Sequence, residues 1–340
     1  MDADVLRRFR CPRCRLPVEE HAAGVVCERD HLTPRRDGFL DAMVGATDPE
    51  TARTLDSFGY EWTTFHRVND EDEAFWKVYF QDVPLEELAG VVGLDAGCGK
   101  GRFTRLTAPH VKALVALDGS SAVEAAVANL SHLDNVEVVR ADLRHAPFED
   151  GSFGFVCSLG VLHHLPDPEG GLHELVRLLA PGGLLLLYLY SRPEGFGVRR
   201  AGLAAAAAMR GASRHLPRPL LRALSALVAA GLYAGMVLPG AVGARRGVTV
   251  LARLPLQAYR NKPLRSLWLD TFDRLSAPLE RRYVWSELEP WFRGARLEVV
   301  AAKEDAGFFI VCRRPPEAAG RAPIWPAPKV PQRANGAESE

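Results

Sequence analysis

The stretch LDAGCGKG, residues 94–101, decides the fold of this chain. An apolar run begins at Val91 and ends within this stretch, and a helix-like segment follows the stretch. Glycines at alternate positions, Gly97, Gly99 and Gly101, allow the backbone to turn tightly and to approach a ligand closely. The N–H groups at the start of the next helix favour an anionic group there. Because a bare turn can also be rich in glycine, the residues around the loop must decide between the two interpretations.

Short apolar runs alternate with helical stretches after this loop. Five runs have the composition of strands, and helix-like segments lie between them. The strand runs are 91–97, 113–118, 136–142, 153–160 and 183–190, and the helical segments are 101–109, 120–131 and 169–179. This alternation predicts a parallel α/β sheet. Two later runs, 296–304 and 307–314, are close enough to pair as a hairpin, and Ser286 and Glu289 before them have capping-box spacing for a helix start.

Three acids and a histidine pair sharpen the interpretation of the loop. Asp118 ends the second strand, where a carboxylate can accept both hydroxyls of a ribose. Asp142 follows the third strand, although an acid there could also cap the start of a loop. The fourth strand leads into GVLHHLPDP, residues 160–168. A nicotinamide-type Rossmann domain also has a glycine loop and a ribose acid, but Asp95 inside the motif, Asp142 and the closing hairpin speak against it.

This set of motifs resembles the class I S-adenosylmethionine (SAM)-dependent methyltransferases with a type 11-like core, over about 91–190 and again over about 286–313. The resemblance implies an α/β, Rossmann-like sandwich whose seven-stranded sheet ends in an antiparallel strand. It also implies an enzyme, with SAM as co-substrate. We expect this core to carry an N-terminal zinc ribbon and a helical insertion before the last strands.

The resemblance implies roles for individual residues. The cofactor-binding set is Asp95, Gly97, Cys98, Gly99, Gly101, Asp118, Asp142, Leu143 and Cys157. Asp95 and the glycine loop would hold the methionine part of SAM, Asp118 the ribose, and Asp142 the adenine amino group, with Leu143 packing on the ring. Cys157 would lie beside the transferable methyl group, although a small buried residue also suits a strand.

A methyl acceptor that attacks through oxygen needs a base, and His163 and His164 are the nearest titratable candidates for this catalytic role. A purely structural role for the pair is the alternative.

The first residues contain the pattern C-x2-C-x12-C-x3-H, formed by Cys11, Cys14, Cys27 and His31. Thiolate pairs with an imidazole suit a closed, structural tetrahedral zinc site, and a segment this short gains folding energy from a metal. His21 is a less favoured fourth ligand, and a degenerate ribbon without metal is the alternative. Because the ribbon is separate from the SAM motifs in sequence, we expect SAM binding to survive loss of the zinc ligands.

The ribbon resembles those that precede the core in ribosomal RNA guanine methyltransferases and in bacterial methyltransferases of unassigned small-molecule or lipid substrate. The stretch SFGYEWTTF, residues 57–65, is similar to the second group. Tyr60 and Trp62 in it could cap the SAM site or belong to the core of a covering helix. We therefore expect methyl transfer to a small-molecule or lipid-like acceptor. The alternatives are ribosomal RNA base methylation, and a membrane- or RNA-docked binding module with a regulatory SAM site.

The segment 195–269 contains 12 Lys and Arg residues but no Asp or Glu. Within it, 223–244 carries no charge, and arginines flank it on both sides. That length could span a bilayer, but Pro239 and many Ala and Gly residues make the run only modestly apolar. A buried helical lid is the favoured interpretation. An interfacial segment on an anionic membrane comes second, and an RNA-binding surface, which would have few aromatic residues for stacking, comes last.

Composition and organisation complete the prediction. The 340 residues include 42 Lys and Arg against 42 Asp and Glu, and 47% are apolar, which excludes collagen-like, coiled-coil and wholly disordered chains. Six cysteines and no apolar leader indicate the cytoplasm, with the inner face of the membrane as a peripheral location.

We expect a ribbon at 1–45, aromatic-rich covering helices at 46–90, the SAM-binding core at 91–190, the basic apolar insertion at 191–275, the C-terminal helix and hairpin at 276–315, and a disordered tail at 316–340.

Overall fold

The computed structural model describes residues 1–45, 47–193, 197–213, 216–252, 254–305, 307–316 and 332–333. The chain folds as two compact units. The first, the core unit, contains Met1–Arg192 and Leu279–Glu340, and the second, the insertion unit, contains Pro193–Pro278. Of the tail predicted to be disordered, 317–331 and 334–340 lie outside the described residues, and Gln332–Arg333 form a short strand, β12, beside β10.

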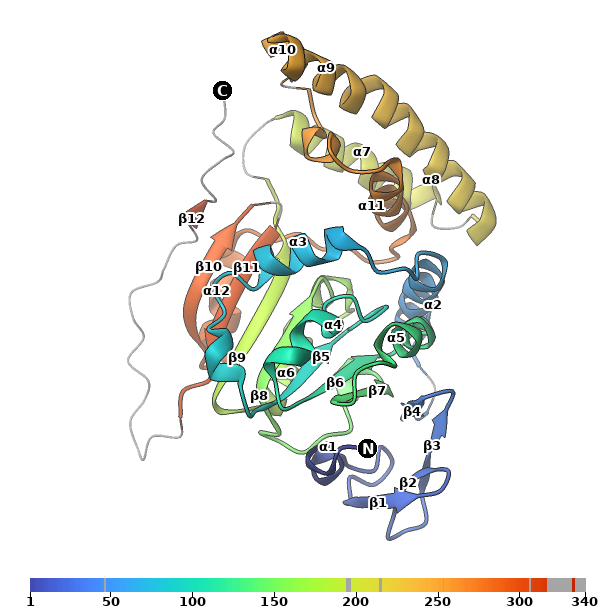
Figure 1. Ribbon diagram of the computed structural model, residues 1–340, viewed down its shortest axis with the longest axis vertical. Helices are drawn as coiled ribbons and strands as arrows, with labels where there is room; N and C mark the ends of the chain where they lie inside the picture. Colours follow the sequence, from blue (N-terminus) through green and yellow to red (C-terminus); the bar gives the residue numbers. More distant parts are fainter. Residues whose placement is uncertain are drawn as a thin grey trace. The chain divides into compact units, whose positions relative to one another are not determined.

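The core unit is built on a sheet that contains the seven predicted strands (Figure 1). Their order across the sheet is β7 (Val136–Arg140), β6 (Ala113–Asp118), β5 (Val92–Ala96), β8 (Phe153–Leu159), β9 (Leu179–Tyr190), β11 (Gly307–Arg313) and β10 (Glu298–Glu304). The first five are parallel, and β11 runs antiparallel to β9 with Ile310 opposite Leu187. This confirms the α/β fold and its reversed last strand.

Alternate side chains of the strands enter different clusters of the core. In β6, Ala113, Val115 and Leu117 join a cluster with residues of α6 (Pro168–Leu178) and α12 (Trp285–Gly294). Leu114 enters a second cluster, which includes Phe80 after α3 (Asp70–Tyr79). Because strand side chains alternate between faces, these apolar runs are buried on both sides, as in a parallel sheet covered by helices.

Local signals set the helix boundaries beside the sheet. Asp167 precedes α6, with Pro168 at its first position, and the Asp167 carboxylate accepts a hydrogen bond of 2.9 Å from the Gly170 N–H. The predicted start of α12 at Ser286 is wrong. Its N-cap is Val284, because the Glu287 carboxylate accepts from the Val284 N–H at 3.1 Å. The remaining helices of the sheet are α4 (Thr104–Thr107) and α5 (Ala122–Leu130), with 3-10 turns η2 (Ala108–His110), η3 (Leu143–His145) and η4 (Leu162–His164).

The N-terminal segment is continuous with the core sheet. It comprises α1 (Ala3–Arg8), β1 (Val18–His21), β2 (Gly24–Cys27), β3 (Leu32–Arg36) and β4 (Phe39–Asp41). Strand β4 pairs in parallel with β7, placing Leu40 opposite Val139. The ribbon therefore extends the sheet at its β7 edge. Helices α2 (Pro49–Thr64) and α3 and the turn η1 (Leu85–Leu88) follow before β5.

The insertion unit is helical. Its elements are α7 (Val198–Ser213), α8 (Arg218–Leu232), the π-helical turn η5 (Tyr233–Val237), α9 (Leu238–Arg246), α10 (Thr249–Ala252), η6 (Gln257–Tyr259) and α11 (Leu264–Ser276). Helices α8 and α9 run on through η5 as one long helix (Figure 1). By length and composition alone, the helix Arg218–Arg246 could cross a membrane.

Candidate active site and metal centre

The glycine loop leaves the carboxyl end of β5 in a conformation that requires glycine. Gly97, Gly99 and Gly101 have φ of 88°, 54° and 78°. A Cβ on Gly97 would lie 2.3 Å from Val161 Cγ2, so a larger residue does not fit there. The N–H groups of Gly97 and Cys98 donate to Leu117 O at 2.7 and 3.0 Å, which fixes the loop against β6. The loop is thus a rigid glycine turn at the strand ends, where ligands of open α/β sheets bind.

Asp118 connects this loop to the turn after β6. Its Oδ2 accepts from the Gly99 N–H at 2.9 Å, and its Oδ1 accepts from the N–H and hydroxyl of Ser120 at 2.8 and 2.6 Å. The carboxylate is therefore held in one orientation at the end of its strand. This is the location expected for an acid that binds ribose hydroxyls.

Asp95 is buried, and its Oδ2 accepts a hydrogen bond of 2.6 Å from the Thr104 hydroxyl. Burial raises the pKa of Asp95 to about 6, against the lowering effect of the hydrogen bonds from Thr104 and Cys157. Burial thus disfavours the ionised form of Asp95, and a cationic ligand group beside the carboxylate would favour it.

Asp142 caps the η3 turn and binds Arg144. Its carboxylate accepts from the Arg144 N–H at 2.9 Å and from the guanidinium at 2.7 to 3.2 Å. The guanidinium also lies 3.0 Å from Asp48, whose side chain caps α2. Asp142 therefore caps the start of the loop, as one of the two interpretations of its position predicts. An adenine amino group that binds Asp142 would share the carboxylate with Arg144. Leu143 is buried beside it. Sequence reasoning missed Arg144, whose only signal is its position two residues after Asp142.

The two cysteines of the predicted cofactor site are buried. The thiol of Cys98 contacts Gly99 O at 3.6 Å, and Cys157 lies at 0% exposure in β8. Burial raises the pKa of both thiols well above the usual range. They are small neutral side chains at neutral pH and do not supply a thiolate nucleophile.

Helix α2 covers the glycine loop. A Cβ on Gly59 would lie 2.4 Å from Ser121 Oγ, and one on Gly99 would lie 3.1 Å from Trp62 Nε1. Trp62 therefore lies against the loop, and its ring also contacts Arg102, whose guanidinium carbon is 5.1 Å from the ring centre. Tyr60 is half-buried on the same helix.

Lys100 holds the segment that covers the glycine loop, residues 49–79, through contacts that sequence reasoning missed. Its ammonium donates to Arg67 O at 2.6 Å and lies 3.7 Å from the Asp72 carboxylate. The Lys100 side chain is 4% exposed, so this ion pair is buried. The only signal in the sequence was a long cationic residue in a loop of otherwise small ones. Lys100 joins the loop to the segment between α2 and α3.

His163 and His164 are buried on η4, and their rings have different surroundings. His164 Nδ1 donates to Leu279 O at 2.5 Å, and its ring edge meets Phe58 of α2. Both ring nitrogens of His163 are buried without a hydrogen-bond partner among the described residues, and its ring centre lies 4.0 Å from that of Tyr190. Burial, followed by the charges of His164 and Arg282, lowers the pKa of His163 well below its usual range. His163 is therefore neutral.

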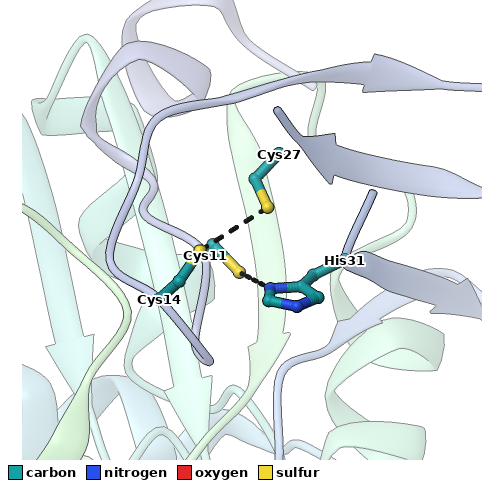
Figure 2. A group of neighbouring side chains, drawn as sticks. All are labelled: Cys11, Cys14, Cys27 and His31. Atoms are coloured by element: carbon teal, nitrogen blue, oxygen red, sulfur yellow. Dashed lines mark hydrogen bonds between the residues drawn. The ribbon is translucent and has the colours of Figure 1, made fainter. Parts of the chain in front are cut away.

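The ribbon brings together the four predicted metal ligands (Figure 2). The ligand atoms of Cys11, Cys14, Cys27 and His31 all lie within 4.8 Å of one another. Cys14 Sγ is 3.6 Å from Cys27 Sγ, and Cys11 Sγ is 3.7 Å from His31 Nδ1. A tetrahedral zinc with Zn–S bonds of about 2.3 Å separates its ligand atoms by about 3.8 Å, so the donor set fits this metal. His21 instead accepts from the Ala23 N–H.

The sequence of this chain is similar to those of known methyltransferases. A family model described as a methyltransferase domain matches residues 94–187. The ubiquinone/menaquinone biosynthesis C-methyltransferase of Hahella chejuensis is 34% identical over 172 residues, which is 48% of this chain and 69% of the relative. The tocopherol O-methyltransferase of Arabidopsis thaliana is 32% identical over 152 residues, 42% of this chain and 41% of that protein. A SAM-dependent methyltransferase structure from Aquifex aeolicus aligns with TM-score 0.40 at 16% identity, over 78% of this chain and 94% of that one.

Proposed function

Since the chain belongs to the SAM-dependent methyltransferases with this methyltransferase domain, we propose that it methylates a small-molecule or lipid-like acceptor. The observation that carries the proposal is the bond from the Gly99 N–H to Asp118, which joins the glycine loop to the acid of the neighbouring strand. The names of the relatives, which mention ubiquinone, menaquinone and tocopherol, support an acceptor of small-molecule size.

We assign SAM to the carboxyl ends of β5, β6 and β7. When bound, SAM supplies a methyl group activated by its sulfonium charge. Asp95 and the glycine loop would hold the methionine part, and Asp118 would accept from the ribose hydroxyls. Asp142, together with Arg144, would border the adenine, with Leu143 packing on its ring. Trp62 and Lys100 would keep water away by holding the cover over the loop.

We propose that His163 orients the nucleophile by accepting a hydrogen bond, since its lowered pKa makes it too weak a base to keep the proton. It is neutral and buried, and its ring nitrogens have no hydrogen-bond partner among the described residues, so it can accept a hydrogen bond from an acceptor hydroxyl. His164 would position the turn through its bond to Leu279 O. An acceptor that reacts through carbon or oxygen could use the same arrangement.

We propose zinc as the structural metal of Cys11, Cys14, Cys27 and His31. Four protein ligands close a tetrahedral site, so no coordination position remains for a substrate or water. Metal analysis of the purified protein should give one zinc per chain. The double variant Cys11→Ser/Cys14→Ser should lose the zinc, and its full retention would contradict the ligand assignment.

Calorimetry with S-adenosylhomocysteine tests the central proposal. The wild-type protein should bind it, and Asp118→Ala should weaken binding by about 1–3 kcal/mol because hydrogen bonds to a desolvated ribose are lost. Asp134→Ala, at an exposed loop position, is the matched control and should bind normally. Absence of binding to the wild-type protein would overturn the proposal.

Turnover then separates the classes of acceptor. Release of S-adenosylhomocysteine should follow addition of the lipid or small-molecule fraction of a cell extract. Turnover with the RNA fraction alone would favour a ribosomal RNA methyltransferase. Binding without turnover on any fraction would favour a docked module with a regulatory SAM site.

A further inference from the structure

The long helix α8–α9 exposes a face that has no polar side chain over much of its length. Its exposed residues between 223 and 244 are Ala223, Leu227, Ala230, Gly231, Ala234, Gly235, Leu238, Val242 and Ala244. Leu227 is 72% exposed and Leu238 is 49% exposed. The solvent face of a helix in a soluble protein normally carries charged and polar residues. Within the described residues of the insertion unit this face has no packing partner, and only 22% of the most apolar window of the helix is buried.

Exposed apolar residues are concentrated in the insertion unit. Among the described residues, eleven large apolar side chains are exposed, and eight of them lie between 209 and 264. The eight are Met209, Leu220, Leu227, Leu238, Val242, Val248, Val250 and Leu264. The insertion unit is about a quarter of the chain but holds most of these exposed apolar side chains. Such a grouping marks an interaction surface, whereas single scattered apolar residues do not.

Basic residues bracket the apolar face. Arg222 is exposed near its start, and Arg245 and Arg246 are exposed at its end. The sequence from 195 to 269 contains no acid. An apolar face about 33 Å long, with cations at both ends and no anions, is complementary to a surface that is apolar inside and anionic at its boundary.

The other face of the helix is fixed within the insertion unit. Trp268 of α11 donates to Ser225 Oγ at 3.0 Å, and Gln257 of η6 donates to Met236 O at 3.0 Å. Helix α11 also carries Asp270 and Asp273. If α8–α9 crossed a bilayer, it would bring these attached acids into the hydrocarbon, which is costly. The packing therefore favours a helix that lies in the membrane plane.

We propose that the exposed face of α8–α9 docks on an anionic lipid bilayer, in the plane of the interface. Leu227, Leu238 and Val242 would enter the boundary of the acyl chains, and Arg245 and Arg246 would contact lipid phosphates, whereas the Arg222 guanidinium lies over the Trp268 ring on the attached side. This proposal is independent of the methyl-transfer proposal. Binding of S-adenosylhomocysteine, measured on the same preparations, distinguishes failure of one from failure of the other.

Flotation of the full-length protein with liposomes tests the docking. The protein should float with phosphatidylcholine–phosphatidylglycerol vesicles at low salt and be released at high salt, because screening shortens the range of the attraction. Leu227→Glu and Leu238→Glu should each lower the partition coefficient by about tenfold or more. Arg245→Ala and Arg246→Ala should each lower it by about fivefold. The matched control is Val78→Glu, at a side chain 47% exposed on α3, which should float like the wild type.

Four outcomes would overturn the proposal. Absence of flotation would show that the face does not dock on anionic lipid, and equal flotation with vesicles of phosphatidylcholine alone would remove the role of charge. Retention after alkaline washing would mean that the helix spans the bilayer. RNA binding that depends on Arg245 and Arg246, without flotation, would assign the surface to RNA.

Discussion

Asp95 illustrates how one residue can cost stability and still serve binding. Its carboxyl group is buried in β5, and burial raises its pKa to about 6 in the folded protein. A carboxyl group with a raised folded pKa stabilises the fold most below its unfolded pKa of about 3.8. This stabilisation is lost as the pH rises through about 6, because the buried group then ionises. At neutral pH the charge therefore opposes folding.

We predict that Asp95→Asn separates these two effects. The substitution removes the charge but keeps an oxygen that can accept from Thr104, so the free energy of unfolding at pH 8 should rise, by at most about 3 kcal/mol. The gain should disappear below pH 4, and binding of S-adenosylhomocysteine should fall sharply. Urea denaturation at the two pH values and calorimetry measure both effects. A loss of stability at pH 8 would mean that the charge of Asp95 has a stabilising partner.

The same carboxyl group predicts a pH dependence of ligand affinity in the wild type. The cationic amino group of SAM would favour ionised Asp95, so affinity should fall as the pH decreases through about 6. Calorimetry in a series of buffers should show this decrease. Asp134→Asn, at an exposed site, should leave the profile unchanged, whereas an affinity that is flat between pH 5 and 7 would remove Asp95 from the amino-group site.

Among the elements, the covering helices depend on one buried cation. Lys100 joins the glycine loop to Asp72 of α3 and to Arg67 O, which lies between α2 and α3. We predict that Lys100→Met loosens this cover, because it leaves the Asp72 carboxylate with one basic neighbour fewer in a buried place. Limited proteolysis should then cut the segment 65–72 faster, and S-adenosylhomocysteine should dissociate faster. Lys77→Met on α3, at a side chain 67% exposed, is the control and should change neither rate.

The ribbon contacts the loop that follows the proposed adenine site. The guanidinium of Arg15 donates to Ala146 O at 2.8 Å and to Phe148 O at 2.7 Å, and the Arg10 N–H donates to Pro147 O at 2.8 Å. Cys11 and Cys27 also belong to the same apolar cluster as the sheet residues of the core unit. The ribbon and the 142–148 loop are therefore one packed structure, although they are distant in sequence.

This packing changes the expectation that SAM binding survives loss of the metal ligands. We predict that Cys11→Ser/Cys14→Ser lowers affinity for S-adenosylhomocysteine by about five- to thirtyfold, a usual size for coupling between two sites. Arg15→Ala should give a smaller decrease with zinc retained, which would identify the contact as the route. Unchanged calorimetric affinity in the zinc-free variant would show that the two sites are independent, as their separation in sequence suggested.

The elements that the sequence predicted well are those whose signal is local. The run 113–118 coincides with β6. Five consecutive apolar residues followed by Asp118 leave little choice for where the strand begins and ends. In contrast, β4 has three residues and no periodicity, and its pairing with β7 depends on distant packing. The bonds of Arg144 to both Asp142 and Asp48 depend in the same way on the placement of α2. Composition cannot show which side chain a carboxylate binds.

At the scale of the whole molecule, the insertion enters and leaves the core unit at one place. The Arg192 N–H donates to Tyr283 O at 2.7 Å, and the Tyr283 N–H donates to Tyr190 O at 3.0 Å. The chain thus leaves after β9 and returns beside it, before α12. A short connection could replace the 86 residues of Pro193–Pro278 without moving the strands on either side. The basic, acid-poor composition of 195–269 is then a property of a separate unit and not of the fold that holds the site.

We predict that a protein in which a short glycine–serine linker replaces 193–278 folds and binds S-adenosylhomocysteine with an affinity within about threefold of the full chain, a difference of less than 1 kcal/mol. The glycine loop, Asp118 and the bonds that hold them all lie in the core unit, so the binding free energy should remain there. The same protein should no longer float with anionic vesicles.

Calorimetry and flotation on one preparation measure both, and a second linker of twice the length controls for strain at the junction. If neither linker preserves binding while the protein remains folded by circular dichroism, the insertion contributes residues to the SAM site. If the shortened protein still floats, the membrane-docking surface belongs to the core unit.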